Sequence, residues 1–421
     1  MNSPILTEAE HITWLRVDVG LAMSARREAS RLAKRVGLPP DRVSAVELAA
    51  TEAATNLQKH AVDGALALRV TRSGPHAGVE FVATDTGPGI AHLASALSDG
   101  TSSTGTLGVG LGAIARLADV FDIHTLPGRG TTVLAQFWAG EEARRAEPTG
   151  IDAGGLTRPI GGEELCGDTW ALRSANASLG RGSGGGPGPV AAQGAGDGRG
   201  LVRSQGPGGG SGPVSANGPG LLPAQGPGDG PEPVSATGPG GGSAQEVTAP
   251  GPAAGPVLAM MCDGLGHGPQ AARAGDVARE AFRDSAHTRP HRVLEDLHRA
   301  LRGTRGAAVA VARVDFAAGT VEFSGVGNVS AFLVRGERRS SLLSVPGIVG
   351  HHMPHTRSFT AEAGPGSVLV MHTDGLSDRW SPQTFPGLFA RRSTVISAQI
   401  LREAGGRRDD IGILVVKAPR P

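Results

Sequence analysis

The chain has no tyrosine, and aromatic residues make up only 3% of its 421 residues. It has two cysteines, Cys166 and Cys262, which excludes a fold organised by disulfides. No apolar run approaches the ~20 residues that a membrane-spanning helix needs. The first residues, MNSPILTEAEH, have neither the basic start nor the apolar core of a secretion signal. These absences predict a reduced, cytoplasmic setting.

A strong net charge is also lacking, because 40 Lys and Arg residues are balanced by 39 Asp and Glu residues, which leaves +1. Without a bulk field of either sign, we expect neither nucleic acid nor a membrane surface as a partner. The length leaves room for about two or three domains of ordinary size.

Glycine and proline are abundant, with 66 and 30 residues, and they concentrate in residues 179–255. This stretch holds imperfect copies of short segments, AQGAGDG and AQGPGDG, then PVSANGPG and PVSATGPG. Its apolar residues are too few to bury a core, so the copies do not predict a repeat fold. The composition indicates a disordered Gly/Pro-rich spacer, with a proline-rich recognition segment as the alternative.

Residues 39–61, PPDRVSAVELAATEAATNLQKHA, have the pattern of a helix. Two prolines and an aspartate give a start signal, and apolar residues from Val43 to Leu57 recur at helical spacing. Glu52 and Asn56 lie four residues apart and therefore share another face. A carboxylate and an amide so placed can hold a divalent cation and orient a hydroxyl, although a solvated helix face would carry the same residue types.

Three glycine-containing motifs follow this helix. The apolar strand 78–85 ends in Asp85, which can accept a hydrogen bond from an adenine amino group, and Gly87 and Gly89 let the backbone approach the base. The run GTLGVGLG, residues 105–112, leads into a helix, 113–118, and its backbone N–H groups suit phosphates. Residues 128–133, GRGTTV, form a turn into a strand.

These elements, N-x-x-x-H, D-x-G-x-G, G-x-G-x-G and G-x-G-T, resemble the ATP-binding fold of the GHKL family over about residues 10–138. Within that family, residues 99–133 are most similar to the RsbT-type serine kinases. The resemblance implies that Glu52 is the general base, Asn56 the Mg²⁺ ligand and Asp85 the adenine contact. Thr132 would support the adenine site. The backbone around the phosphates and lid would come from Gly87, Gly89, Gly108 and Gly110.

In the C-terminal half, acidic residues recur at the ends of apolar strands. Asp168 opens DTWALR, Asp263 lies at the end of PVLAMMCDG, Asp374 follows SVLVMHT, and Asp409 and Asp410 precede IGILVVKA. Carboxylates at one end of a sheet can converge, and such oxygen ligands suit Mg²⁺ or Mn²⁺ rather than zinc. Two such ions can activate a water for in-line attack on a phosphate.

This pattern resembles the SpoIIE-type branch of the PPM metal-dependent phosphatases, in the compact form of RsbX-like phosphatases, over residues 149–178 and 256–421. The resemblance implies that Asp263 bridges both metals and that Asp374 and Asp409 hold the second one. The Gly264 carbonyl and Asp168 would complete the site.

Four further side chains keep two interpretations each. Asp410 is either a ligand or a support, and His267 either touches substrate or caps a helix start. Cys166 and Cys262 are either small buried residues or a redox brake on the neighbouring metal ligands.

The spacer has an unusual place in this scheme. The family joins the strand carrying Asp168 to the strand carrying Asp263 by a short turn, whereas about 80 residues separate them here. We therefore predict that residues 179–255 are an insertion within the phosphatase domain and that residues 1–140 form the N-terminal domain. Loop-closure entropy grows only logarithmically with length, so such an insertion costs only a few kcal/mol.

The sequence thus predicts an α+β chain with a GHKL (Bergerat) α/β sandwich and a PPM-type β-sandwich flanked by helices. We expect a bifunctional switch regulator that uses ATP, Mg²⁺ and Mn²⁺. One domain would phosphorylate or bind a STAS-type anti-sigma antagonist, a stressosome-like protein or a sigma-factor regulator, and the other would dephosphorylate serine or threonine. The alternative is an ATP-binding module that only sequesters its partner, fused to an active phosphatase.

Overall fold

The computed structural model describes residues 5–73, 76–97, 110–140, 151–161, 163–175, 255–406 and 408–418. The predicted spacer falls outside these ranges except for its last residue, and so does Gly108. The described residues before and after the spacer group into one compact unit. Within the described ranges, no helix combines the length and the apolar character needed to cross a membrane.

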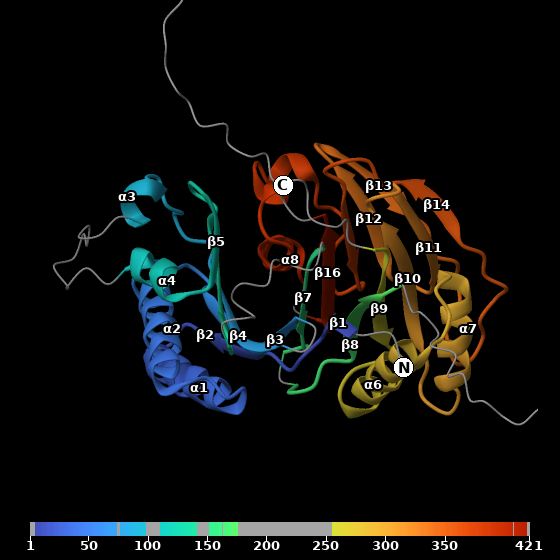
Figure 1. Ribbon diagram of the computed structural model, residues 1–421, viewed down its shortest axis with the longest axis horizontal. Helices are drawn as coiled ribbons and strands as arrows, with labels where there is room; N and C mark the ends of the chain where they lie inside the picture. Colours follow the sequence, from blue (N-terminus) through green and yellow to red (C-terminus); the bar gives the residue numbers. More distant parts are fainter. Residues whose placement is uncertain are drawn as a thin grey trace, which may run out of the picture. The chain divides into compact units, whose positions relative to one another are not determined.

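The N-terminal module is a five-stranded antiparallel sheet in the order β2-β3-β4-β6-β5, with helices on one face (Figure 1). Helices α1 and α2 pack side by side on that face, and α4 packs against α2. The strands are β2 Thr13–Arg16, β3 Ala65–Ser73, β4 His76–Thr84, β5 Val120–Leu126 and β6 Gly130–Trp138. The helices are α1 Leu21–Arg35, α2 Pro40–His60, α3 Leu93–Leu97 and α4 Leu111–Leu117. This two-layer arrangement confirms the predicted α/β sandwich.

Helix α2 shows how local sequence builds this layer. Pro39 is its extended N-cap and Pro40 its first residue, a position where the missing proline N–H costs no hydrogen bond. Its buried side chains, mostly alanines and valines, share one core cluster with the inner faces of β3, β4 and β6. The helix predicted over residues 39–61 is confirmed, and Glu52 and Asn56 remain on its half-buried side.

The opposite face of the same sheet is also buried. Ala67, Val82 and Leu134 from alternate positions of its strands share a cluster with Leu156 and with apolar residues of helix α8, Ser393–Ala404. Helix α8 contacts β4, β5 and β6 directly. The sheet is therefore covered on both faces, which explains why nearly every residue of β4 and β6 is buried.

The C-terminal module is a sandwich of two sheets. One has the order β1-β8-β9-β10-β11-β14 and the other β13-β12-β15-β16-β7. The first sheet contains β1 Ile5–Glu8, β8 Asp168–Ser174, β9 Val257–Gly264, β10 Ala307–Asp315, β11 Thr320–Val326 and β14 Phe359–Glu362. The second contains β7 Asp152–Arg158, β12 Ser330–Arg335, β13 Arg338–Leu342, β15 Val368–His372 and β16 Ile411–Lys417.

The inner faces of these sheets form a core that includes Trp170, Met261, Leu369 and Leu414. Helices α6 Pro269–Asp284 and α7 Pro290–Ala300 cover the outer face of the first sheet (Figure 1). Helix α8 covers the second sheet through β7 and β16. Short 3₁₀ turns occur at Pro382–Thr384 and Leu388–Ala390. The predicted β-sandwich flanked by helices is confirmed.

Strands β8 and β9 are antiparallel neighbours, with register partners from Asp168 opposite Asp263 to Ser174 opposite Val257. The two strands that border the spacer in sequence are therefore paired in space, as expected. The proposed bounds of the two domains remain a proposal. One detail departs from them, because residues 5–8 pair with β8 and not with the N-terminal sheet. This pairing satisfies a backbone edge of β8 that would otherwise be open.

Candidate functional site

The first candidate site lies where β4 ends, beside α2. Asp85 directly follows β4, and its Oδ1 accepts a hydrogen bond from the Gly87 backbone N–H at 2.7 Å. Burial raises the pKa of the Asp85 carboxyl, and the N–H of Gly87 opposes that effect. Burial also raises the pKa of Glu52 on α2, against the lowering effect of Lys59. A half-buried carboxyl with a raised pKa is the kind of group that can act as a general base.

The glycines of the D-x-G-x-G motif are needed for space. A Cβ on Gly87 would lie 2.7 Å from the His60 carbonyl oxygen. Gly89 has φ +70°, and a Cβ there would lie 2.3 Å from the Leu126 carbonyl oxygen. Any side chain at either position would clash with backbone, so the loop after Asp85 takes this path only with glycine.

The remaining nucleotide-site candidates are placed as follows. Thr132 is fully buried on β6, and its hydroxyl contacts that of Thr84 at 3.2 Å. Gly110 is the N-cap of α4 and its carbonyl accepts the first hydrogen bond of that helix. Asn56 lies one turn beyond Glu52 on α2. Gly108 lies outside the described residues.

The second candidate site is a group of aspartates where the two sheets of the sandwich meet. Asp168 and Asp263 are register partners on β8 and β9. Asp374 follows β15, and Asp409 and Asp410 precede β16, which pairs with β15. The Thr373 hydroxyl donates to Asp168 Oδ2 at 2.7 Å and accepts from the Gly412 N–H at 2.8 Å. The five carboxyls thus come from strand ends of both sheets.

The carboxyls of this group raise one another's pKa values. Burial raises the pKa of Asp263 to about 7, with a further contribution from the charges of Asp374, Asp409 and Asp410. Burial and the charge of Asp263 raise the pKa of Asp168 well above its usual value. Burial and the charge of Asp409 also raise the pKa of Asp374, and the Asn328 side chain opposes that effect. A divalent cation would relieve this repulsion.

The chemical type of the donor atoms suits such a divalent cation. It consists of carboxylate oxygens, with the Gly264 carbonyl at the end of β9, and oxygen ligands suit Mg²⁺ and Mn²⁺. In the part of the chain that is described, no three His, Cys, Asp or Glu side chains already form a metal-binding group.

Asp410 differs from the other acidic residues because both of its carboxylate oxygens accept hydrogen bonds from backbone N–H groups. Its oxygens accept hydrogen bonds from the backbone N–H groups of Ile160 and Gly167, each at 2.6 Å. These bonds tie β16 to the turns that flank β7 and β8. Of the two interpretations, support fits this geometry better than metal ligation.

His267 and the cysteines are also resolved by their surroundings. His267 Nδ1 lies 3.3 Å from Glu163 Oε1, and the N-cap of helix α6 is Gly268, with no side-chain cap hydrogen bond. The cap interpretation of His267 is therefore wrong. Burial raises the thiol pKa of Cys166 and of Cys262. Thiols that resist ionisation react slowly, which favours small buried residues over a redox brake.

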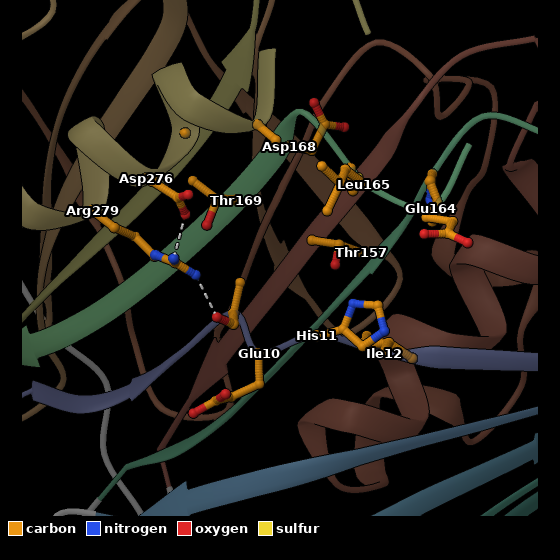
Figure 2. A pocket seen from close by; sticks show the side chains of 15 residues that line it. Glu10, His11, Ile12, Thr157, Glu164, Leu165, Asp168, Thr169, Asp276 and Arg279 are labelled. Carbon is orange, nitrogen blue, oxygen red and sulfur yellow. Dashed lines mark hydrogen bonds and ion pairs between the residues drawn. The ribbon is translucent and has the colours of Figure 1, made fainter. Parts of the chain in front are cut away.

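A cavity of about 180 Å³ lies behind Asp168 (Figure 2). The segment 9–12, Cys166, Thr169 and helix α6 line it. Figure 2 shows Arg279 pointing to Asp276 and to the N-terminal segment, where it donates to the Ala9 carbonyl at 2.6 Å. The residues that line this cavity include none of the proposed nucleotide-site residues.

Sequence reasoning missed the side chains that hold the candidate ligands in place. Thr373 orients Asp168, and the Asn328 side-chain amide donates to Asp374. For Thr373 the available signal was its position immediately before Asp374. Asn328 ends the run GVGN, residues 325–328, which resembles the SpoIIE-type family, but its contact with Asp374 was not predicted. On helix α8, Gln399 and Arg402 contact the N-terminal module, and no sequence motif predicts these contacts.

Comparisons with known proteins agree with this architecture. Residues 16–137 match the family model of the histidine kinase-like ATPase domain, and residues 253–419 match that of stage II sporulation protein E. Fold and site therefore define an ATPase-type domain joined to a PP2C-type phosphatase domain.

The serine/threonine-protein kinase RsbT of Bacillus subtilis is 30% identical over 116 residues, which are 28% of this chain and 87% of RsbT. The phosphoserine phosphatase RsbX of the same organism is 24% identical over 123 residues, which are 29% of this chain and 61% of RsbX. The chain thus belongs to the family of RsbT-like ATPase domains and fuses that domain to a SpoIIE-type phosphatase domain.

A solved structure of the PP2C domain and a regulatory fragment of SpoIIE from Bacillus subtilis aligns at 11% identity. The alignment covers 95% of this chain and 94% of that one with a TM-score of 0.38.

Proposed function

We propose that the chain is a bifunctional partner-switching regulator. Its N-terminal domain transfers phosphate from ATP to a serine or threonine of a STAS-type anti-sigma antagonist or a stressosome-like partner. Its C-terminal domain hydrolyses phosphoserine or phosphothreonine in a Mg²⁺- or Mn²⁺-dependent reaction. The observation that carries this proposal is the meeting of aspartates from both sheets of a SpoIIE-type domain within the same compact unit as an RsbT-like domain.

In the kinase reaction, Asp85 would accept a hydrogen bond from the adenine amino group, and Asn56 would hold the Mg²⁺ that accompanies ATP. Glu52 would take the proton of the partner's hydroxyl as the hydroxyl oxygen attacks the γ-phosphorus, and the bond from that phosphorus to the β,γ-bridging oxygen would break to release ADP. The raised pKa of Glu52 brings this base closer to neutral pH, where proton transfer is efficient.

In the phosphatase reaction, Asp263, the Gly264 carbonyl, Asp374 and Asp409 would hold the metal ions, with Asp168 completing the site. Bound ions lower the pKa of a coordinated water and so supply the nucleophile. Thr373 and Asn328 fix the direction of Asp168 and Asp374, and Asp410 ties β16 to the turns around β7 and β8.

The test uses the full chain with a STAS-domain protein as substrate. Incubation with ATP should label one serine or threonine, found by phosphosite mapping, and withdrawal of ATP with addition of Mn²⁺ should remove the label. The second candidate function, partner sequestration without transfer, would give an ATP-dependent complex with no label at any residue.

A further inference from the structure

Helix α8 belongs to the phosphatase module by its contacts with β7 and β16, yet it also lies against the N-terminal sheet. Leu134 and Val82 of that sheet share a buried cluster with Ile396 and Ile400 of α8. This apolar contact fixes which polar side chains of α8 can reach the sheet. Two of them meet the residues that we place at the adenine site.

The first contact is made by Arg402, near the end of α8. Its Nη1 donates a hydrogen bond to the backbone carbonyl of Asp85, and its Nη2 bonds Glu403 at 2.7 Å. The arginine side chain is only 6% exposed, so this donor is held in place. Gly130 permits the approach, because a Cβ there would lie 1.9 Å from the same carbonyl oxygen.

The second contact is made by Gln399, one turn earlier on α8. The Thr132 hydroxyl donates to Gln399 Oε1 at 2.8 Å, and both side chains are buried. The same hydroxyl touches that of Thr84. Gln399 therefore sets the orientation of the Thr132 hydroxyl, because an acceptor on α8 occupies its donor direction.

Asp85 is thus held by three hydrogen bonds, one each at its backbone N–H, its carboxylate and its backbone carbonyl. Its N–H donates to the Thr131 carbonyl at 3.0 Å, its carboxylate accepts from the Gly87 N–H at 2.7 Å, and its carbonyl accepts from Arg402. Two of these bonds arise within the N-terminal sheet and its loop, and the third comes from the phosphatase domain. A carboxylate that must meet an adenine amino group depends on such fixed geometry.

We infer that Arg402 and Gln399 are positioning residues of the adenine site, supplied to the ATPase domain by helix α8 of the phosphatase domain. This inference rests on the proposed roles of Asp85 and Thr132. Neither side chain needs to touch the nucleotide, since each acts through the residue that does. The ATPase domain of this chain would then bind nucleotide with full selectivity only when α8 is in place.

The test is equilibrium binding of ATP and of GTP, each with Mg²⁺, to the full chain. Arg402→Ala should weaken ATP binding about fivefold to tenfold, the effect of one hydrogen bond. It should leave GTP binding nearly unchanged, because guanine has no amino group at the position that Asp85 reads. Gln399→Met, which keeps volume without the acceptor, should act in the same direction, and Arg402→Lys should recover part of the loss.

Arg391→Ala is the matched control. Arg391 lies just before α8 and contacts Asp122 of β5 at 3.4 Å, so it belongs to the same face without touching Asp85 or Thr132. Its removal should not change the ratio of ATP to GTP affinity. Melting curves of each variant verify folding.

Asp85→Asn distinguishes failure of the adenine-site assignment from failure of the positioning role of Arg402 and Gln399. If Asp85→Asn weakens ATP binding but the Arg402 and Gln399 variants keep the affinity and the ATP preference of the parent chain, the positioning role is wrong and the adenine site stands. If Asp85→Asn also binds ATP like the parent, the site assignment fails and the inference falls with it.

Discussion

Asp263 is the residue on which the phosphatase assignment can be tested most directly. Asp263→Ala should lower Mn²⁺-dependent hydrolysis of an aryl phosphate by about two orders of magnitude or more, because the attacking water loses its activating ions. A chelator should abolish the activity of the parent chain. Asp276→Ala is the control, since that carboxylate is 69% exposed on α6 and pairs only with Arg279 in the described contacts. An Asp263→Ala variant with parental activity would contradict the two-metal site.

Glu52 and Asp85 should fail in different ways, since one is assigned to chemistry and the other to binding. Glu52→Gln should leave the Kd for ATP within about twofold and remove phosphate transfer, because a base acts on the hydroxyl and not on the nucleotide. Asp85→Asn should weaken binding. Glu47→Gln, on the same helix one turn earlier and paired with Arg26, is the control for transfer. Loss of ATP binding in Glu52→Gln would reverse the assigned roles.

At the scale of elements, strand β5 carries a buried histidine whose pKa is lowered by burial and by arginines at and just before α8. His124 is 3% exposed, and burial together with the charges of Arg391 and Arg402 lowers its pKa to about 4. Asp122 opposes this shift and Arg129 adds to it. A histidine in the unfolded chain has a pKa of about 6.5. Between about pH 4 and about pH 6.5, the unfolded chain therefore binds a proton that the folded chain excludes.

Stability from neutral His124 is therefore complete above about pH 6.5 and is lost as the pH falls toward 4. His124→Gln should give a shallower fall of the melting temperature over this window than the parent chain shows. His352→Gln, at an exposed position, should leave the slope unchanged. Equal slopes for the parent and His124→Gln would show that this histidine does not titrate with unfolding.

The helices and strands differ in how well their positions could be predicted from the sequence. Helix α2 and strands β8, β9 and β16 have strong periodic or apolar patterns and obvious boundaries, and the sequence located them. The pairing of β1 with β8 had no such signal, because a four-residue strand gains its partner only in the folded sheet. The second role of α8 was equally hidden, since nearly all of its residues are buried, polar ones such as Gln399 included, and its sequence pattern does not show which neighbour each residue contacts.

The candidate sites follow the same division. Aspartates after apolar strands and glycines in short motifs are visible in sequence because the chemistry requires those residue types. Thr373, Gln399 and Arg402 act through hydrogen bonds to such residues, and many residue types could do so. Supporting groups are therefore found only when tertiary contacts bring them beside the motif.

For the whole molecule, the contacts of α8 mean that the two domains are not structurally independent, because a helix of the phosphatase domain packs on the N-terminal sheet. Ala67, Val82 and Leu134 on the outer face of the N-terminal sheet are buried in a cluster shared with α8 and other elements of the C-terminal module. A fragment of residues 1–140 would thus uncover apolar surface as well as lose Arg402. The ATPase and phosphatase domains of this chain are best compared as variants of the intact protein.

The spacer gives the last test at this scale. Strands β8 and β9 pair from Asp168 opposite Asp263 to Ser174 opposite Val257, so the chain ends on either side of the spacer already lie together. Replacing residues 182–253 by a short glycine-containing turn should therefore leave phosphatase activity intact, with a melting temperature equal to or slightly above that of the parent, because the closing loop is shorter. A chain that begins at Ala254 has no β8 strand beside β9 and no Asp168, and it should aggregate or lose activity. Full activity in the chain beginning at Ala254 would show that Asp168 is dispensable and that the spacer is an ordinary linker between domains.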